Sequence, residues 1–415
     1  MDTLPFYQTA TYSVTPLGQR CGLIQWVEGS TPLFQLYWKW RVRRTKFLAE
    51  LEEIKLNKQQ ANTNNSTPST KRGGLIDISQ KHKSNVKDKS STILSTEPTR
   101  PIEHFFDKLK EVFAENVCPF LFINFSILQD IAKQRVADRR RWPPKLMLRV
   151  LQDLIAETPR DILAKEIWMH SSTSGSWWER TQNFARTTAV SSMIGALFGL
   201  GDRHLDNVLI NLSTGQVVHV DWNVCFGKGK QLRVPEIVEF RLTGNIMHAL
   251  GPTKVEGIFR QSCERVLEML RGDKRIILFL LETFKFDAML DLSLLQGPST
   301  TRKTNDEMAS EIIHRIEQKL LGYELIYNKS GEKDVEGSEM ASGMLRLPKE
   351  NLGDEDEIKN NIELQTFKRE QSSTPSSEWI ESAQLSVEDQ VDLLINEATD
   401  LSNLSLMYEG WTAWV

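Results

Sequence analysis

The chain has 415 residues, of which 40% are hydrophobic and 26% are charged. The length allows two or three domains, and the composition is typical of a globular protein. The net charge of -4 does not indicate nucleic-acid binding by the chain as a whole. The four cysteines fit neither a zinc spacing nor a dense disulfide framework, which favours a reducing compartment. No secretory signal or membrane-spanning run is visible, so we expect an intracellular protein.

The first hundred residues divide into an ordered part and a polar part. Residues 10–30 favour a strand and a turn, and Ser30-Thr31-Pro32 predicts the start of a long helix with an apolar stripe that includes Leu36 and Tyr37. The basic insert 55–100 is rich in Asn, Ser, Thr and Lys and has few apolar anchors. We therefore predict that it is disordered.

Helical patterns dominate the rest of the chain. They cover residues 101–200, including one helix from about Trp177 to Leu200, and resume at 255–270, 275–284 and 306–321. Two β-rich pieces, 208–211 and 216–220, interrupt them and are joined by a turn-forming Ser-Thr-Gly, which predicts a hairpin. The acidic stretch 326–382 is predicted to be disordered, and a last amphipathic stretch follows over 387–406.

The residues that indicate a chemistry lie on both sides of this hairpin. Phosphoryl transfer needs a carboxylate that orients the attacking hydroxyl, oxygen ligands for magnesium, and a polar group that meets the developing charge. Asp202, His204 and Asn207 supply three such groups before the hairpin. Because a hairpin brings its two ends together, Asp221 after it can share one magnesium ion with Asn207. Any one of these residues alone is more often a cap or a surface group, but the four in this order favour a phosphoryl-transfer site.

The pattern Asp202-Arg203-His204-x-x-Asn207 followed by Asp221 resembles the catalytic and metal-binding loops of the phosphatidylinositol 3-kinase-related protein kinases. The resemblance implies that Asp202 orients or deprotonates the substrate hydroxyl and that His204 stabilises the transferring phosphate or helps to move a proton. Asn207 and Asp221 are then the ligands of Mg²⁺ or Mn²⁺, ATP is the cofactor, and Arg203 anchors the loop.

The stretch Gly22-Leu23-Ile24-Gln25-Trp26-Val27 is similar to the hinge between the two lobes of these kinases. By that resemblance Trp26 stacks on adenine and the Val27 backbone binds the edge of the base, while Leu209 and Val220 form the adenine floor. Taken alone, an aromatic residue in an apolar run is more often part of a core.

Two further stretches narrow the resemblance. Residues 384–415, with the ending Gly-Trp-Thr-Ala-Trp-Val, resemble the short FATC domain found at the carboxyl end of these kinases. The segment from Trp222 to Phe240 is similar to their activation loop, but Trp222-Asn223 stands where most relatives have Phe-Gly. The branch of the family that acts in nonsense-mediated mRNA decay also lacks that glycine.

The fold implied by the resemblance is α+β: a protein/lipid-kinase-like C-lobe that is mainly helical with short β hairpins, an N-lobe that is largely missing, and a helical FATC tail. The expected divisions are 1–30 for the remnant of the N-lobe and hinge, 31–325 for the C-lobe with its insert, 326–382 for the acidic linker and 383–415 for FATC. The first lysine is Lys39, after the hinge, so the phosphate loop and phosphate-binding lysine are not in this sequence. We therefore expect a fragment rather than a short product that does not catalyse.

The activity implied is that of a serine/threonine protein kinase for Ser/Thr-Gln sites. Its implied partners are an RNA helicase of mRNA surveillance and the regulatory subunits of the decay kinase complex, in the cytoplasm and also in the nucleus. Neither direct membrane contact nor direct RNA binding is indicated. Three alternatives stay open: a lipid kinase of the same superfamily, against which the FATC-like tail argues; a non-catalytic docking module; and a family member of growth or DNA-damage signalling.

Overall fold

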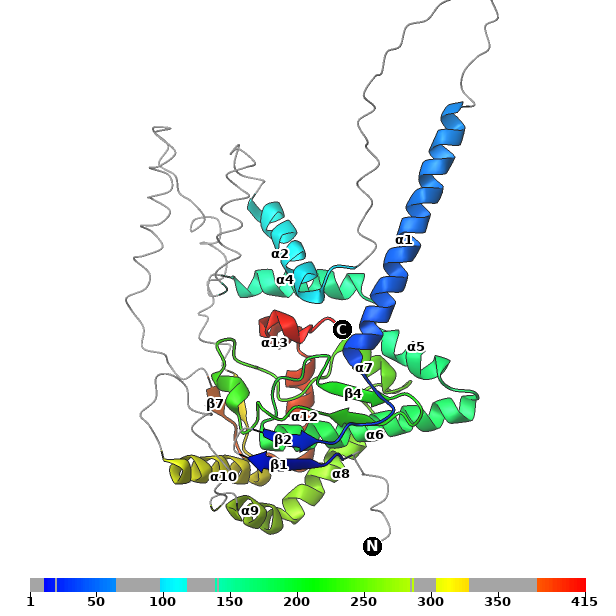
Figure 1. Cartoon of the computed structure of the whole chain (residues 1–415). Helices are drawn as coiled ribbons and strands as arrows, with labels where there is room; N and C mark the ends of the chain where they lie inside the picture. Colours follow the sequence, from blue (N-terminus) through cyan, green and yellow to red (C-terminus); the bar gives the residue numbers. More distant parts are fainter. Residues whose placement is uncertain are drawn as a thin grey trace, which may run out of the picture.

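The structure is a computed structural model that describes residues 11–18, 21–64, 98–117, 139, 142–283, 286, 304–327 and 379–415. Within these ranges the fold is mainly helical, with short antiparallel strand pairings, which confirms the predicted fold class (Figure 1). The strands are β1 (Val14–Gly18), β2 (Cys21–Ile24), β3 (Ser30–Pro32), β4 (Val208–Asn211), β5 (Val217–His219), β6 (Leu325–Tyr327) and β7 (Trp379–Glu381). The helices are α1 (Leu33–Asn64), α2 (Pro101–Val117), α4 (Pro144–Glu157), α5 (Ile162–Met169), α6 (Ser174–Phe198), α7 (Gly244–Ala249), α8 (Ile258–Gly272), α9 (Lys274–Thr283), α10 (Asn305–Leu321), α12 (Val387–Thr399) and α13 (Leu401–Leu406), with 3₁₀ turns η4 (Lys228–Gln231) and η8 (Glu409–Trp411).

The sheet formed by β3, β4 and β5 carries the predicted hairpin. Strands β4 and β5 pair with Val208 opposite His219, and β3 adds to the free edge of β4 with Pro32 opposite Leu209. Since β3 follows the expected hinge by only a few residues, the pairing places the hinge beside the hairpin although they are far apart in sequence. This sheet therefore brings together the segments that carry the predicted site residues.

Helix α6 lies under the hairpin and packs against α5, α8 and β5 (Figure 1). It begins at a capping box in which Thr173 and Ser176 exchange side chain-to-backbone hydrogen bonds, which satisfies amides that the first turn leaves unpaired. Its second half is buried almost all round, and Phe184, Ala189 and Met193 belong to the main hydrophobic core. The helix is thus a fixed base for the loop that follows it.

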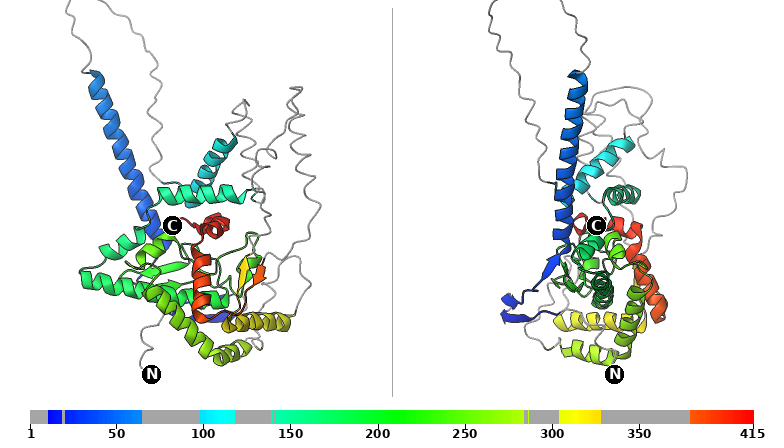
Figure 2. Two further views of the ribbon diagram at one scale, coloured as in Figure 1. Left: turned by 180° about the vertical axis from the view of Figure 1, so that it is seen from behind. Right: turned by 90° about the vertical axis from the view of Figure 1, so that its right-hand side faces the viewer.

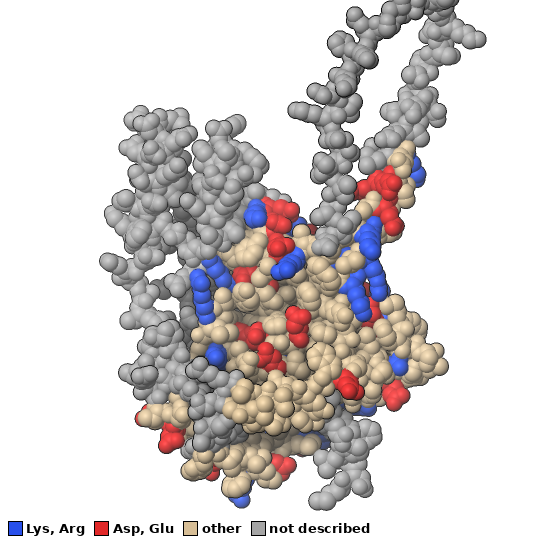
Figure 3. All heavy atoms as spheres, in the orientation of Figure 1, with Lys and Arg blue, Asp and Glu red and all other residues tan. Residues whose placement is uncertain are grey.

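Helix α1 projects away from this core. It carries a group of basic side chains near the point where the helix joins the core (Figure 3). These side chains fasten the helix: Arg43 forms an ion pair with Glu166 of α5 at 3.4 Å, and Arg44 donates to the carbonyl of Glu157 at the end of α4. The helix continues to Asn64. The prediction that disorder starts at residue 55 is therefore wrong for 55–64, because helix propagation outlasts the apolar stripe; residues 65–97 lie outside the described residues.

The carboxyl-terminal segment packs into the body of the protein rather than beside it (Figure 2). Helix α12 lies on α8, and α13 lies on α4. The amphipathic stretch 387–406 forms two helices, because the Asp400 side chain accepts from the Ser402 amide at 2.9 Å and caps a new helix. The last residues are buried, and Trp414 stacks on Phe105 of α2 at 6.0 Å between ring centroids.

The predicted linker 326–382 is not disordered at its two ends. Residues 325–327 and 379–381 pair as β6 and β7, with Ile326 opposite Ile380. Composition misses these short strands because each supplies only a few residues and depends on the other for its hydrogen bonds. Residues 328–378 lie outside the described residues. In the part of the chain that is described, no helix combines the length and the apolar character that crossing a membrane requires.

Arg241 is the residue that fixes the tail. Its guanidinium is buried and donates to the main-chain oxygens of Trp411 at 2.6 Å, Thr412 at 2.8 Å and Val415 at 2.9 Å. It also lies 4.4 Å from the centre of the Trp411 ring. Burial lowers the pKa of Arg241 to about 9, so the group is charged at neutral pH. One side chain therefore satisfies several carbonyls that end the chain.

Replacement of Arg241 by methionine is expected to loosen the tail. It keeps the apolar volume but removes the donor of the Trp411 and Val415 oxygens, while the Thr412 oxygen keeps its bond from the Val415 amide. The loss costs about 2 kcal/mol or more. Hydrogen exchange over residues 401–415 should accelerate strongly while exchange in α6 changes much less. The control is Arg149→Met on α4, where the side chain is 62% exposed and has one ion pair with Asp153. Unchanged exchange in the tail of the Arg241 variant would contradict this account.

Candidate active site

The loop of residues 199–207, called the site loop below, begins with a sharp turn at the end of α6. Gly199 has a φ of 59°, and a Cβ there would lie 2.5 Å from the amide nitrogen of Gly227. Only glycine fits such a close approach of two backbones. Main-chain bonds from Gly201 to Val224 at 2.8 Å and from Phe226 to Phe198 at 2.7 Å then tie the loop to the segment after Asp221. We call that segment, residues 222–240, the activation segment.

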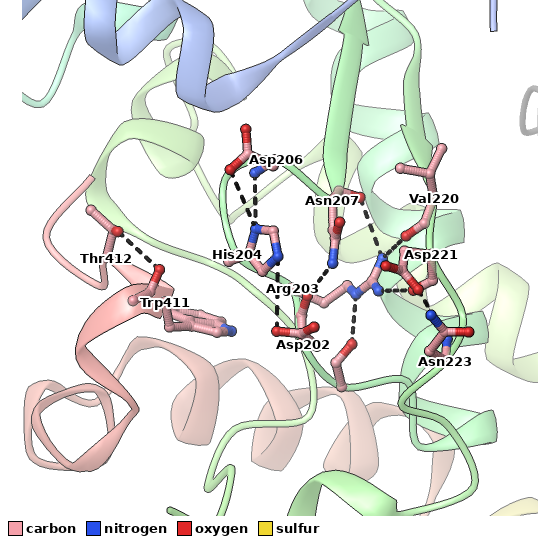
Figure 4. Close-up of polar contacts among 12 residues, drawn as sticks. Asp202, Arg203, His204, Asp206, Asn207, Val220, Asp221, Asn223, Trp411 and Thr412 are labelled. Atoms are coloured by element: carbon pink, nitrogen blue, oxygen red, sulfur yellow. Dashed lines mark hydrogen bonds and ion pairs between the residues drawn. The ribbon is translucent and has the colours of Figure 1, made fainter. Parts of the chain in front are cut away.

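The hairpin returns Asp221 to the side of Asn207. Val208 pairs with His219, and the Val220 amide donates to the Asn207 carbonyl at 3.1 Å. The juxtaposition expected from the hairpin is therefore present (Figure 4). The metal-binding role of the two residues stays a prediction.

Arg203 joins the two sides. It is 2% exposed, and its guanidinium donates to the carbonyls of Gly201 at 2.8 Å, Val220 at 2.7 Å and Asn207 at 3.3 Å, and to that of Asp221 (Figure 4). The structure thus agrees with the anchoring role expected for Arg203.

Asp202 is held in a conformation that is unusual for its residue type. Its φ is 56°, in the left-handed region. Its carbonyl accepts from Nδ2 of Asn207 at 2.9 Å, and its carboxylate is 46% exposed, with Oδ1 4.0 Å from Nε2 of His204. The amide of Asp206 donates to Nδ1 of His204 at 3.1 Å, so the neutral ring carries its proton on Nε2, the nitrogen that faces Asp202. A carboxylate and an imidazole N–H therefore stand together at an open surface.

The donor atoms at Asn207 and Asp221 fit a magnesium ion. Because Nδ2 of Asn207 is used by the Asp202 carbonyl, its amide oxygen is the atom left for a ligand role. The Asp221 carboxylate accepts from the Asn223 amide at 3.3 Å, which fixes its direction and leaves further lone pairs. One carboxylate and one neutral oxygen are the usual protein share of a Mg²⁺ ion carried by nucleotide phosphates.

The expected adenine-binding residues are arranged around the same sheet. The Val27 carbonyl accepts from the Ser30 hydroxyl at 2.7 Å, just before β3, and β3 pairs with β4, where Leu209 lies. Val220 follows β5. Trp26 is 82% exposed, so its ring faces solvent and packs little against the described residues. The register places Pro32, not Val27, opposite Leu209. The adenine-binding roles of Trp26, Val27, Leu209 and Val220 stay predictions.

A cavity of about 280 Å³ lies next to Asp221. Trp222 and His219 line it, and Trp222 donates from Nε1 to the His219 carbonyl at 3.3 Å. Burial, with the nearby Arg203 charge, lowers the pKa of His219 to about 3, so this imidazole is neutral. Trp222, which follows Asp221, therefore has a hydrogen-bond partner in this fold.

Sequence reasoning missed two residues that support the site loop. Glu236 of the activation segment accepts the Asp202 amide with Oε1 at 2.8 Å, and Arg241 donates to the Arg203 carbonyl at 3.2 Å. Burial raises the pKa of Glu236 to about 7, and the neighbouring Asp202 carboxylate acts in the same direction. The only sequence feature that could have indicated Glu236 and Arg241 is their position near the end of the activation segment. That position does not predict which atoms their side chains contact.

Comparison with known proteins places this site in a family. The chain matches the phosphatidylinositol 3- and 4-kinase model over residues 123–294 and the FATC model over 384–415. It is similar to serine/threonine-protein kinase SMG1 of Danio rerio, with 42% identity over 69% of this chain and 7% of the relative, and to smg-1 of Caenorhabditis briggsae, with 36% identity over 71% of this chain and 11% of the relative. An open conformation of CtTel1 has a similar fold, with a TM-score of 0.58 at 22% identity, covering 99% of this chain and 10% of that one.

The chain therefore belongs to the phosphatidylinositol 3-kinase-related protein kinases, as the site loop and tail predicted. Within that family its match to the SMG1 proteins extends over about 70% of the chain. It spans about a tenth of the length of these relatives.

The raised pKa of Glu236 predicts a pH-dependent effect of Glu236→Gln on stability. The carboxyl titrates near 7 when folded and near 4.5 when exposed, so wild-type stability falls as pH rises through this window, because the unfolded chain releases its proton first. The glutamine variant lacks this loss, and its advantage over wild type should be larger at pH 8 than at pH 4 by up to roughly 3 kcal/mol.

The measurement is urea unfolding of both proteins at the two pH values. Glu268→Gln on α8, where the side chain is 61% exposed, is the matched control and should behave like wild type at both. An equal stability difference at pH 4 and pH 8 for the Glu236 variant would show that its carboxyl titrates normally.

Proposed function

We propose that the protein is a serine/threonine protein kinase that transfers the γ-phosphate of ATP to Ser/Thr-Gln sites. The observation that supports this most is the arrangement of Asp202 and His204 beside the Asn207–Asp221 pair, held by one buried arginine. The family supplies the class of reaction, and the tail favours a protein over a lipid substrate. ATP with Mg²⁺ supplies the phosphoryl group and neutralises its charge when bound.

The roles proposed for the chain's own residues follow from their geometry. The exposed carboxylate of Asp202 accepts the proton of a serine or threonine hydroxyl or directs that hydroxyl towards the phosphate. His204 carries its proton on Nε2 and can donate a hydrogen bond to an oxygen that gains negative charge. Asn207 and Asp221 hold the metal. Arg203 reacts with nothing, because its donors are taken by main-chain oxygens.

The proposed setting is nonsense-mediated mRNA decay, with a surveillance RNA helicase as substrate and the decay kinase complex as partner, in the cytoplasm and also in the nucleus. Support for this setting is the similarity to the SMG1 proteins and the Trp222-Asn223 pair.

The test is phosphate transfer by the natural polypeptide that contains this sequence, purified through a tag ahead of its first residue so that the buried tail is undisturbed. With Mg²⁺ and ATP we expect transfer to a Ser-Gln peptide and much less to the same peptide with Ser-Ala. Asp202→Ala should reduce the rate by at least about 100-fold. Asp107→Ala on α2, where the side chain is 56% exposed, is the control and should keep the wild-type rate.

Three results would contradict the proposal. Transfer that survives Asp202→Ala would remove the proposed role of this carboxylate. Transfer to phosphoinositide vesicles but not to the peptide would favour a lipid kinase. No transfer by the wild-type polypeptide, with partner binding intact, would favour a docking module.

A further inference from the structure

We propose that Glu236 is a positioning residue for phosphoryl transfer: from the activation segment it accepts the amide of Asp202 and fixes the main chain from which the catalytic carboxylate projects. This inference rests on the proposed function, in which Asp202 faces the substrate hydroxyl. A side chain of the activation segment thus forms a hydrogen bond directly to the main chain of the proposed catalytic residue.

The backbone conformation of Asp202 needs hydrogen bonds that stabilise it. With a φ of 56°, it is in a region that residues with a Cβ rarely adopt and that persists only where the surroundings over-determine it. Two hydrogen bonds act on its own peptide groups: its carbonyl accepts from Asn207 Nδ2 at 2.9 Å, and its amide donates to Glu236 Oε1 at 2.8 Å. The peptide that precedes Asp202 is held on both sides, because Nε of Arg203 donates to its Gly201 carbonyl at 2.8 Å. Without the second bond, only this contact with the carbonyl is left and the N–H of the same peptide loses its acceptor.

The site of the Glu236 carboxylate is built to admit it. A Cβ on Gly201 would lie 2.0 Å from Oε2, and a Cβ on Gly229 would lie 2.3 Å from the same atom. Two glycines, one on the site loop and one in η4, therefore leave the space that the carboxylate fills. The Glu236 amide donates to the Gly229 carbonyl at 3.0 Å, which fixes the base of the side chain as well as its tip.

The charges around Glu236 favour a positioning role over an ion pair. It is 8% exposed, and the charged groups that act on it are Asp202, Arg203 and Glu239. The guanidinium of Arg203 is committed to main-chain oxygens, while both carboxylates repel Glu236. A residue kept for charge would have a cation as its direct partner. Here the direct partner is an amide, so an uncharged acceptor of the same length should serve.

The experiment compares Glu236→Gln, Glu236→Asp and Glu236→Ala in the same natural polypeptide. Glutamine presents an oxygen to the Asp202 amide and should keep kcat within about threefold of wild type. Aspartate keeps the charge but is one methylene too short, and alanine has no acceptor; both should lower kcat by about 10- to 100-fold. The KM for ATP should change by less than about twofold, because the metal and adenine residues are untouched.

Hydrogen exchange at the Asp202 amide gives a readout that does not need activity. In wild type and the glutamine variant this amide should be protected, and in the aspartate and alanine variants it should exchange faster while α6 keeps its protection. If wild type transfers no phosphate, the proposed function fails, and this pattern still tests the hydrogen bond.

Three outcomes would overturn the inference: aspartate as active as glutamine, losses shared equally by kcat and the KM for ATP, or unchanged exchange at Asp202 in the aspartate variant. Glu268→Ala on the surface of α8 is the control for substitution of a glutamate and should leave all readouts at their wild-type values. If the alanine variant does not fold, the glutamine–aspartate pair decides alone.

Discussion

The buried guanidinium of Arg203 is the interaction on which the site depends. A chain that must bring a loop and a hairpin together leaves carbonyls facing each other, and such groups are costly to bury unless a donor meets them. Arg203 supplies several donors in one rigid plane, to Gly201 and Asn207 on one side and to Val220 and Asp221 on the other. The spacing of the residues proposed for catalysis and for metal binding is thereby set by backbone bonds rather than by their own flexible side chains.

A second buried arginine, Arg241, binds main-chain carbonyls in the same way next to the site loop. Arg241 donates to the Arg203 carbonyl and to the tail, so the site loop and the carboxyl-terminal residues share one donor. A second buried group extends the support to the activation segment: Lys319 of α10 lies 3.0 Å from Glu239 and 3.6 Å from Glu324, and Glu324 accepts from Gln390 of α12 at 2.6 Å. In this chain the FATC region is therefore part of the body that supports the site loop.

The sequence was sufficient where function depends on local order along the chain. The hairpin over 208–220, the juxtaposition of Asn207 and Asp221 at its two ends and the start of a long helix near Leu33 all follow from turn residues and periodicity, and all are present. It was insufficient where one short element depends on a distant partner. Strands β6 and β7 are examples, because neither has a pattern of its own.

The supporting residues of the site illustrate the same limit. Glu236 is one carboxylate among many in the sequence, and its contact with Asp202 exists only because Gly201 and Gly229 lie face to face in the fold. Trp26 is the opposite case, a residue that the sequence pattern predicted as part of the site but that has few contacts in the fold. The hinge-like pattern predicted that it stacks on adenine, and its side chain is exposed in the described structure. A role in stacking depends on what it meets, which a pattern alone does not provide.

We propose that Asn207 and Asp221 form the metal site of a phosphoryl-transfer centre. The most direct test is a structure of the natural polypeptide with Mn²⁺ and a non-hydrolysable ATP analogue, in which anomalous scattering locates the metal. We expect one Mn²⁺ ion bound directly by the Asn207 amide oxygen and the Asp221 carboxylate, on the side of Asp202 and His204. Bound nucleotide with Mn²⁺ that contacts neither side chain would contradict it.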